Sequence, residues 1–297
     1  MLKRSLSLLM MLLILCCALG SYADQGEDYA LPLDMDFACY EPNPSCFTAD
    51  GYQDESLTVR TEHRKENGVI FDLIWFTVKH PSQLRTLTAG TPNEPQIELV
   101  SRMSRYVHAV AAINGEYYLQ RDRGILVYRQ GVLYRNEPDP RKDILVIDSA
   151  GDFHVFCSED KEQELAAYTE AGGDIVNAFS FGPALVRDGE AVQVRPDYFF
   201  NADQRLPRSV IAQVGPLSYV FVVAEGKKKD SKGCTHQEMA DFMAGLQVQT
   251  AYNLDGGQST VLMFNSTYFL DFYREMEREQ SDMVFVTTAV DPKTWRK

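Results

Sequence analysis

Short-spaced metal motifs are missing from this sequence of 297 residues, and so are internal repeats and low-complexity segments. Neither a CxxC nor an HExxH pattern occurs, and the five histidines are scattered along the chain. Zinc sites need cysteine and histidine ligands at such spacings, so the sequence predicts no zinc site. We expect no bound metal and no cofactor.

Positively charged residues are also fewer than negatively charged ones. Lysine and arginine number 29 against 42 aspartates and glutamates, which gives a formal net charge of −13. Nucleic acid and anionic lipid both need clustered positive charge, so neither is an expected partner, although a local basic patch for one phosphate is still allowed. The basic stretch at 227–232 is interpreted as a solvated loop. The 45% hydrophobic content is typical of a globular chain with a large core.

Long apolar runs are confined to the N-terminus. Lys3 and Arg4 precede a short uncharged run at 8–19, and 21–23 offers small residues at the spacing that a signal peptidase needs. This order is typical of a secretory signal, and the run is too short for a comfortable membrane span. We expect cleavage after Ala23 and a secreted or periplasmic protein with no stable membrane span. The remaining chain has 27 basic and 42 acidic side chains, a net charge of −15.

Cysteine is sparse in what remains. Two of the six cysteines leave with the signal; a lipoprotein anchor at Cys16 is the less favoured alternative, because the bulky Leu15 precedes it. An oxidising compartment permits disulfides among the other four, which allow three connectivities. The sequence does not choose between these pairings and buried thiols. The four are Cys39, Cys46, Cys157 and Cys234.

The chain does contain a long succession of strand signals. Residues 68–79 are rich in β-branched and aromatic side chains. Helical spacing occurs at 97–107 and 161–171, and Thr235 with Glu238 makes a capping box that opens a third helix. Many strands with few helices predict an α+β fold, a single domain of mixed, strand-rich sheets with a few packed helices. Further strands are expected at 110–113, 124–128, 144–148, 153–156, 181–187, 210–214 and 219–224.

Four parts are expected along the chain. The signal at 1–23 is followed by a polar, proline-containing leader at 24–56, which would serve as a linker or as a strap across the domain. The domain itself is expected to span 57–290, with a short tail at 291–297.

Four turn-like elements carry functional groups at expected strand ends. The most informative is Asp255-Gly256-Gly257, where an apolar run ends in an aspartate followed by two glycines. Glycine adopts backbone angles that side chains forbid and lets a ligand approach the main chain. The alternative is a plain type I′ hairpin turn, for which Asp-Gly is a strong signal. The other elements are Asn114-Gly115-Glu116, Ser180-Phe181-Gly182-Pro183 with Arg187-Asp188-Gly189, and Leu206-Pro207-Arg208-Ser209.

In this order the motifs resemble those of the phosphodiester glycosidase domain family. Its lysosomal member is N-acetylglucosamine-1-phosphodiester alpha-N-acetylglucosaminidase, and its bacterial relatives are exported and often labelled as exopolysaccharide-related. The family pattern runs from Asn-Gly-Gly through Gly-Pro-x-Leu-Val-x-(Asp/Asn)-Gly, Pro-Arg-Thr, a strand ending in Asp-Gly and a Gly-Met-Thr-Leu helix start to Asn-Leu-Asp-Gly-Gly-Gly-Ser. The resemblance covers about residues 57–290, with motifs at 113–118, 181–189, 207–209, 223–226, 233–236 and 253–259.

The resemblance implies hydrolysis of a sugar 1-phosphodiester, which releases the sugar and a phosphomonoester. Asp255 would be the carboxylate that stabilises the oxocarbenium-like transition state or activates water, and Glu116 the second carboxylate. Arg208 would bind the phosphate oxygens, and Asn114 would bind sugar hydroxyls. The other predicted substrate-binding residues are Ser209, Gly182, Gly256 and Gly257.

Four positions depart from the family pattern. Glu116 replaces the second glycine, Ser209 replaces threonine but keeps the hydroxyl, Glu225 replaces aspartate, and Gln258 replaces the third glycine. Extra side chains near the cleft would change the preferred substrate or abolish the activity.

Other functions compete with this interpretation. The main alternative is a non-catalytic envelope protein that binds polysaccharide or accompanies exopolysaccharide. A serine nucleophile at Ser180, with Asp188 and His236, needs a helix directly after the serine, but the following residues indicate a strand. Carboxylates close to Asn114 would also suit calcium, although no EF-hand spacing is present.

Overall fold

The computed structural model describes most of the chain beyond the N-terminal segment, namely residues 33, 39–91, 94–116, 118, 125–137, 139–199, 201–272 and 276–295. The predicted signal at 1–23 lies outside these residues. Within the described part of the chain, no helix has both the length and the apolar character that a membrane crossing requires.

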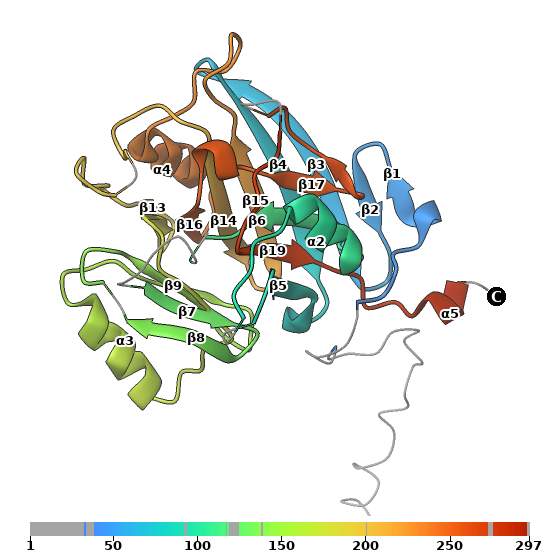
Figure 1. The fold of residues 1–297 in the computed structure, drawn as a ribbon, viewed down its shortest axis with the longest axis horizontal. Coiled ribbons are helices and arrows are strands. Elements are labelled where there is room, and N and C mark those ends of the chain that lie inside the picture. The colour runs from blue at the N-terminus through green and yellow to red at the C-terminus, as the bar shows by residue number, and fades with distance from the viewer. Residues whose placement is uncertain are drawn as a thin grey trace, which may run out of the picture.

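The strands of the described chain form three antiparallel sheets (Figure 1). The largest has the order β1-β2-β3-β4-β15-β14-β16-β12-β13. Its strands are β1 Phe47–Thr48, β2 Gly51–Gln53, β3 Leu57–Glu66, β4 Val69–Val78, β15 Ser218–Ala224, β14 Arg208–Gly215, β16 Thr250–Leu254, β12 Ala184–Arg187 and β13 Glu190–Ala191.

Two five-stranded sheets complete the strand content. One has the order β10 Phe153–Phe156, β9 Ile144–Ile147, β11 Asn177–Phe179, β7 Ile125–Arg129 and β8 Val132–Glu137. The other has the order β18 Thr267–Tyr268, β17 Leu262–Phe264, β6 Ala111–Asn114, β19 Asp282–Val286 and β5 Leu84–Thr88. The helices are α2 Val100–Tyr106, α3 Lys161–Glu170, α4 His236–Gly245 and α5 Pro292–Trp295, with short 3₁₀ turns at Pro44–Cys46, Pro81–Gln83 and Gly257–Ser259.

The central strands of the large sheet are covered on both faces. Side chains alternate along β4, so that Leu73 joins the core under α4 while Ile74 joins the core shared with the two smaller sheets. Val210 and Ile211 divide in the same way on β14. Burial on both faces explains why these segments are apolar almost without interruption.

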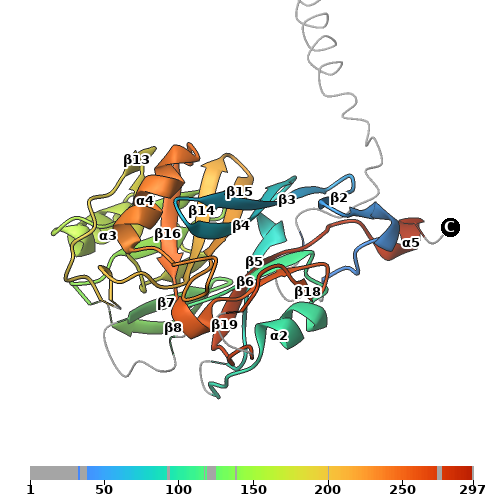
Figure 2. The same cartoon turned by 90° about the horizontal axis from the view of Figure 1, so that it is seen from above.

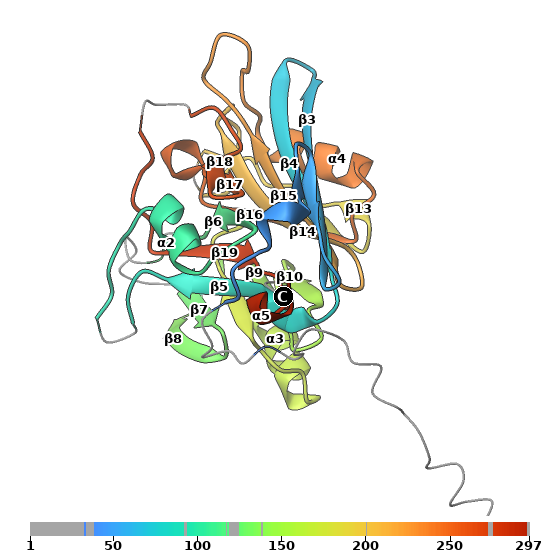
Figure 3. The ribbon, with the colours of Figure 1, turned by 90° about the vertical axis from the view of Figure 1, so that its right-hand side faces the viewer.

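The helices cover separate parts of this core. The hydroxyl of Thr235 accepts a hydrogen bond from the Glu238 main chain, and the Glu238 carboxylate accepts one from the N–H of Thr235, so the predicted capping box starts α4. Met239 and Met243 of α4 pack on the large sheet. Figures 2 and 3 show α4 and α2 on opposite sides of the molecule, with α2 over the sheet that contains β6 and β19.

The predicted α+β fold with a single domain is confirmed. The predicted leader at 24–56 contributes part of the large sheet, because β1 and β2 extend it beyond β3. The four cysteines from Cys39 to Cys234 are all free thiols, and Cys39 and Cys234 are buried.

Candidate functional site

The turn motifs lie close together at one edge of the large sheet. Strands β15 and β16 flank β14 and run antiparallel to it, so both end where β14 begins. Arg208, the first residue of β14, pairs with Ala224, the last residue of β15. Glu225 and Asp255 follow the ends of β15 and β16 directly. The motifs that were predicted to act together therefore meet at one edge.

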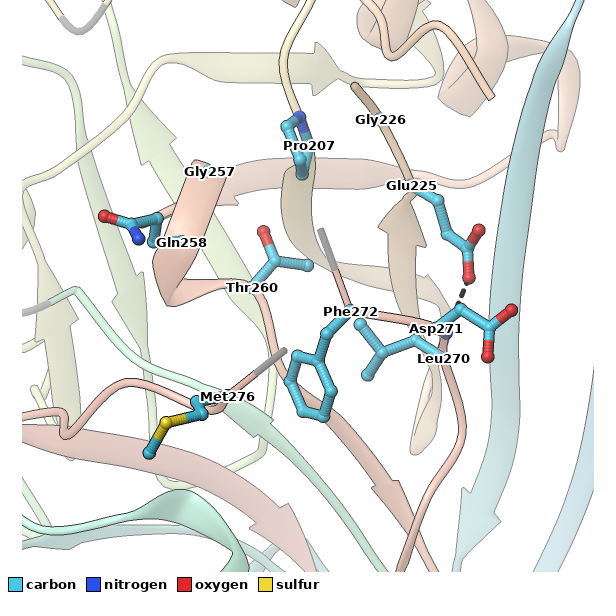
Figure 4. Close-up of a pocket in the computed structure, with 10 residues that line it drawn as sticks. All are labelled: Pro207, Glu225, Gly226, Gly257, Gln258, Thr260, Leu270, Asp271, Phe272 and Met276. Atoms are coloured by element: carbon cyan, nitrogen blue, oxygen red, sulfur yellow. Dashed lines mark hydrogen bonds between the residues drawn. The ribbon is translucent and has the colours of Figure 1, made fainter. Parts of the chain in front are cut away.

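A small pocket lies at this edge (Figure 4). Its wall includes residues of the Pro-Arg-Ser, Glu-Gly and Asp-Gly-Gly motifs and of the segment after β18. The lining residues that matter most below are Pro207, Glu225, Gly226, Gly257, Thr260 and Phe272. Glycines and a proline line one side of the pocket, and a phenylalanine lines another. A ligand could therefore contact the main chain and an apolar ring at the same time.

Asp255 is held at this edge from a second sheet. It is half-buried, and its main-chain N–H donates to the oxygen of Gly115 over 3.2 Å. The side-chain amide of Asn114 donates to the main-chain oxygen of Asp255 over 2.7 Å. The amide oxygen of Asn114 accepts from the hydroxyl of Ser209 and from the N–H of Val261, at 2.8 and 3.1 Å. Contact of Asn114 and Ser209 with a sugar remains a prediction; here their polar atoms form a buried brace.

Two glycines permit this close packing. A Cβ on Gly115 would lie 2.2 Å from a carboxylate oxygen of Asp282, and one on Gly256 would lie 2.6 Å from the oxygen of Pro207. Gly257 has φ of 64° and donates its N–H to the same Pro207 oxygen. Gly182, another predicted binding position, has φ of 72° and accepts from the Asn253 amide. Glycine at these motif turns is therefore required by packing and by backbone conformation.

Glu116 lies in the interior, not at the pocket wall. Its carboxylate accepts from Arg129 and from the Ser180 main chain, both at 2.8 Å. Arg129 also binds Asp282 over 2.7 Å and lies on the ring of Phe179 at 4.0 Å. Burial raises the pKa of Glu116, while the charge of Arg129 opposes this shift. The predicted second carboxylate is thus part of a buried ion triad.

Arg208 is also engaged inside the protein. Its guanidinium donates to the main-chain oxygens of Asn201 and Gln204 at 2.8 Å each, and to that of Cys234 at 3.2 Å. It also lies 2.8 Å from Nε2 of His236, whose pKa is held well below its usual range by burial and by the Arg208 charge. Burial lowers the pKa of Arg208 to about 10, so it remains charged at neutral pH. Direct phosphate binding by Arg208 stays a prediction; the observed contacts are those of a clamp that ties 201–204 and the start of α4 to β14.

Sequence reasoning assigned no role to several residues of the pocket, of which Glu225 and Thr260 matter most for its chemistry. Glu225 was noted as a departure from the family pattern, but nothing marked it as a carboxylate of the pocket wall. Thr260 lines the pocket at 3% exposure, and among the described residues its hydroxyl has no hydrogen-bond partner. Its place one residue after Ser259 at the end of the glycine-rich motif was the only available signal.

The competing chemistries find little support in the geometry. Ser180 is 1% exposed, and its hydroxyl is bonded to the main chain of Leu126. The strand β12, not a helix, follows it, so it lacks the geometry of a nucleophile elbow. In the described ranges, no group of three or more histidine, cysteine, aspartate or glutamate side chains is placed to hold a metal ion.

Comparison with known proteins agrees with the motif order. The sequence model of the phosphodiester glycosidase family matches residues 108–287, which include every motif from Asn114 to Asp255. The chain belongs to the phosphodiester glycosidase family. A curated relative of this phosphodiester glycosidase domain is the SPbeta prophage-derived protein YomE of Bacillus subtilis (strain 168), 24% identical over 209 residues. The match covers 68% of this chain and 31% of YomE, so the chain spans about a third of that relative.

Solved structures share the fold of the phosphodiester glycosidase domain. The zebrafish N-acetylglucosamine-1-phosphodiester alpha-N-acetylglucosaminidase catalytic domain, auto-inhibited by its pro-peptide, aligns with a TM-score of 0.61 at 18% identity. The alignment covers 84% of this chain and 87% of that one. A hypothetical protein from Synechocystis aligns with a TM-score of 0.60 at 15% identity, covering 78% of this chain and 62% of that one. At these identities the likeness establishes the fold.

Proposed function

We propose that this chain is an exported hydrolase that cleaves a sugar 1-phosphodiester and releases the sugar and a phosphomonoester. The observation that carries the proposal is that Asp255, directly after β16, lies at the same sheet edge as the pocket that Glu225, Gly226 and Gly257 line. Membership of the phosphodiester glycosidase family supports the reaction class. The signal pattern at 1–23 supports export.

Asp255 is the proposed carboxylate at the anomeric carbon. A glycosyl transition state resembles an oxocarbenium ion, so a carboxylate beside it stabilises positive charge or activates water. The main chain of Asp255 is fixed by Gly115 and Asn114, so the backbone that carries the carboxylate is held in place. A fixed backbone reduces the entropy that is lost when the carboxylate is positioned against a substrate.

Glu225 takes the place that Glu116 was predicted to occupy as the second carboxylate. It lines the pocket, whereas the Glu116 carboxylate is enclosed by Arg129 and Ser180. Strands β15 and β16 lie on either side of β14, so their backbones are about 10 Å apart. We propose that the sugar binds at this edge, between Glu225 and Asp255.

The leaving phosphate needs charge neutralisation more than a strong general acid. We assign this to Arg208 acting through its charge, because it is buried and follows Pro207, a residue of the pocket wall, in the chain. A charge in a low-dielectric interior acts over longer distances than one in water. The clamp contacts of Arg208 also keep Pro207 and its main-chain oxygen in place for the glycine turn.

The proposal is tested by hydrolysis of a panel of sugar 1-phosphodiesters by the mature protein and by Asp255→Asn, with Asp241→Asn as the matched control on the exposed face of α4. We expect turnover by the wild type and the control, and a loss of at least about 100-fold in kcat for Asp255→Asn with binding retained. Circular dichroism and thermal unfolding establish that each variant is folded. Absence of turnover on every substrate, with sugar polymers still bound, would favour the non-catalytic polysaccharide-binding alternative.

A further inference from the structure

A row of polar side chains crosses three neighbouring strands beside the pocket. His63 on β3 is the register partner of Asp72 on β4, and Asp72 is the partner of Val223 on β15. Glu225 follows Val223 by two residues, and its N–H continues the ladder by donating to Ile70. Residues two apart along a strand share a face, so the row from His63 through Asp72 reaches Glu225 at the pocket wall.

The hydrogen bonds in this row leave one oxygen without a donor. Nδ1 of His63 lies 2.6 Å from Oδ1 of Asp72. Glu225 accepts from the main chain of Asp271 at 2.7 Å, as Figure 4 shows, and from Nζ of Lys228 at 3.0 Å. Asp72 is 1% exposed, and among the described residues its Oδ2 meets no hydrogen-bond donor.

A proton on one of the two carboxylates would account for this arrangement. Two ionised carboxylates only accept hydrogen bonds, and burying two like charges side by side is unfavourable. Glu225 already has two donors, one of them a cation, so its ionised form is the better supported of the two. A proton on Oδ2 of Asp72 then donates to Glu225, while Oδ1 accepts from His63.

The charges around the pair agree with this assignment. Burial and then the neighbouring Glu225 raise the pKa of Asp72 to about 8. Lys228, from the turn after β15, opposes the shift, and Asp271, from the segment after β18, adds to it. His63, from β3, also contacts Asp72, and its side chain is 63% exposed.

We propose that Asp72 and Glu225 share one proton, and that neutral Asp72 is the positioning residue that holds the ionised Glu225 carboxylate at the wall of the pocket. The inference rests on the proposed function, in which Glu225 faces the sugar. Because Glu225 also binds the Asp271 main chain, the pair fixes the rim that carries Phe272. When the pH rises enough to ionise Asp72, repulsion between the carboxylates releases both Glu225 and this rim.

The melting temperature measured at several pH values tests the shared proton and needs no substrate. The folded protein keeps the Asp72 proton to a higher pH than the unfolded chain does, so its stability falls as pH rises from about 4 to 8. Asp72→Asn presents an amide N–H to Glu225 and an oxygen to His63 at every pH, so we expect its melting temperature to exceed that of the wild type by roughly 5 °C at pH 8 and by little at pH 4. Asp241→Asn, an exposed aspartate on α4, should follow the wild type throughout. Parallel wild-type and Asp72→Asn curves between pH 4 and 9 would overturn the proposal.

Two further measurements separate this inference from the proposed function. Carboxyl-carbon NMR titration of the unsubstituted protein, with Glu225→Gln for assignment, should show an Asp72 carboxyl that is still protonated above pH 7; an ordinary titration near pH 4 would refute the pair even if Asp72→Asn failed to fold. With an active substrate, the alkaline fall in kcat of the wild type should vanish in Asp72→Asn, and an unchanged profile would contradict the positioning role. If the protein turns over no phosphodiester, the proposed function fails, while the unfolding and NMR results still decide the pair.

Discussion

The side-chain amide of Asn114 donates a 2.7 Å hydrogen bond to the main-chain oxygen of Asp255, although 141 residues separate the two in the chain. The bond joins the end of β6 in one sheet to the end of β16 in another. The same asparagine accepts from Ser209, at the start of β14. One buried amide therefore fixes the backbone that presents the proposed catalytic carboxylate.

Removal of this amide should be costly. Asn114→Ala leaves the hydroxyl of Ser209 and the N–H of Val261 without their acceptor in a fully buried position. We expect the free energy of unfolding to fall by about 2–4 kcal/mol, measured by urea denaturation. Asn136→Ala, at an exposed position of β8, is the control and should change it by less than about 0.5 kcal/mol. Equal effects of the two substitutions would show that Asn114 is not a brace.

Glycine at position 115 should be required by packing. A Cβ there would meet the carboxylate of Asp282, which the Arg129 side chain and the Glu116 main chain hold in place. Gly115→Ala should destabilise the protein by at least about 2 kcal/mol in the same urea assay. For Gly245→Ala we expect the opposite effect, an increase in stability.

The last residue of α4, Gly245, has open space around its Cβ position and a backbone that alanine tolerates. Gly245→Ala should therefore stabilise the protein by about 0.5–1 kcal/mol. Destabilisation by Gly245→Ala, or a neutral Gly115→Ala, would contradict the steric account of these two positions.

We predict that the hydroxyl of Thr260 binds the substrate, because it lines the pocket. Thr260→Val removes a buried hydroxyl that has no partner among the described residues, so folding should be unaffected or slightly favoured. Loss of one hydrogen bond to substrate should raise KM by roughly 5–10-fold. Ser259→Ala removes a comparable buried hydroxyl that does not line the pocket, and should leave KM unchanged. Steady-state kinetics on the two variants checks this, and equal KM values would exclude a ligand role for Thr260.

A second buried aspartate should give stability a separate pH dependence. Asp143 accepts from the N–H of Ala184 over 3.0 Å, and burial raises its pKa to about 6. The folded state thus binds this proton more tightly than the unfolded chain does. The stability that this proton contributes is fully present below about pH 4 and is lost as the pH rises to about 6. Asp143→Asn should remove this fall and gain on the order of 2 kcal/mol over the wild type between pH 4 and 7.

Calorimetry at several pH values measures the effect of Asp143→Asn, with the exposed Asp160→Asn as control. The Asp143 contribution ends near pH 6, whereas that of Asp72 continues to about pH 8, so the two substitutions are distinguished by where the curves diverge. A constant difference between wild type and Asp143→Asn at every pH would contradict the shifted pKa.

Local features of the fold were predictable. The capping box of Thr235 and Glu238 started α4 where expected, because its hydrogen bonds join neighbouring residues. The strand at β4 followed from its β-branched and aromatic side chains. By contrast, nothing local revealed that β1 and β2 of the polar leader extend the large sheet, since their hydrogen bonds depend on the partner strand β3.

The site was predictable only in part for the same reason. Asp255 and the Asp-Gly-Gly turn were evident from the motif and its order along the chain. Glu116 was predicted as the second carboxylate from the family resemblance, because it belongs to the Asn114-Gly115-Glu116 motif. Its neutralising partner Arg129 lies on another strand, and pairing with it could not be deduced from spacing.

By itself, the sequence determined the α+β class, the motif order that marks the family, and the positions of the turns, because these depend on residue types and on contacts between near neighbours. Tertiary structure alone decided which of the polar side chains face the pocket. Strand order brings Glu225 to the pocket wall and Asp72 beside it, and the crossing of sheets buries Asn114, Ser209 and Glu116. Burial and pairing across distant segments set both the accessibility and the charge of these groups, and neither property belongs to a residue before the chain is folded.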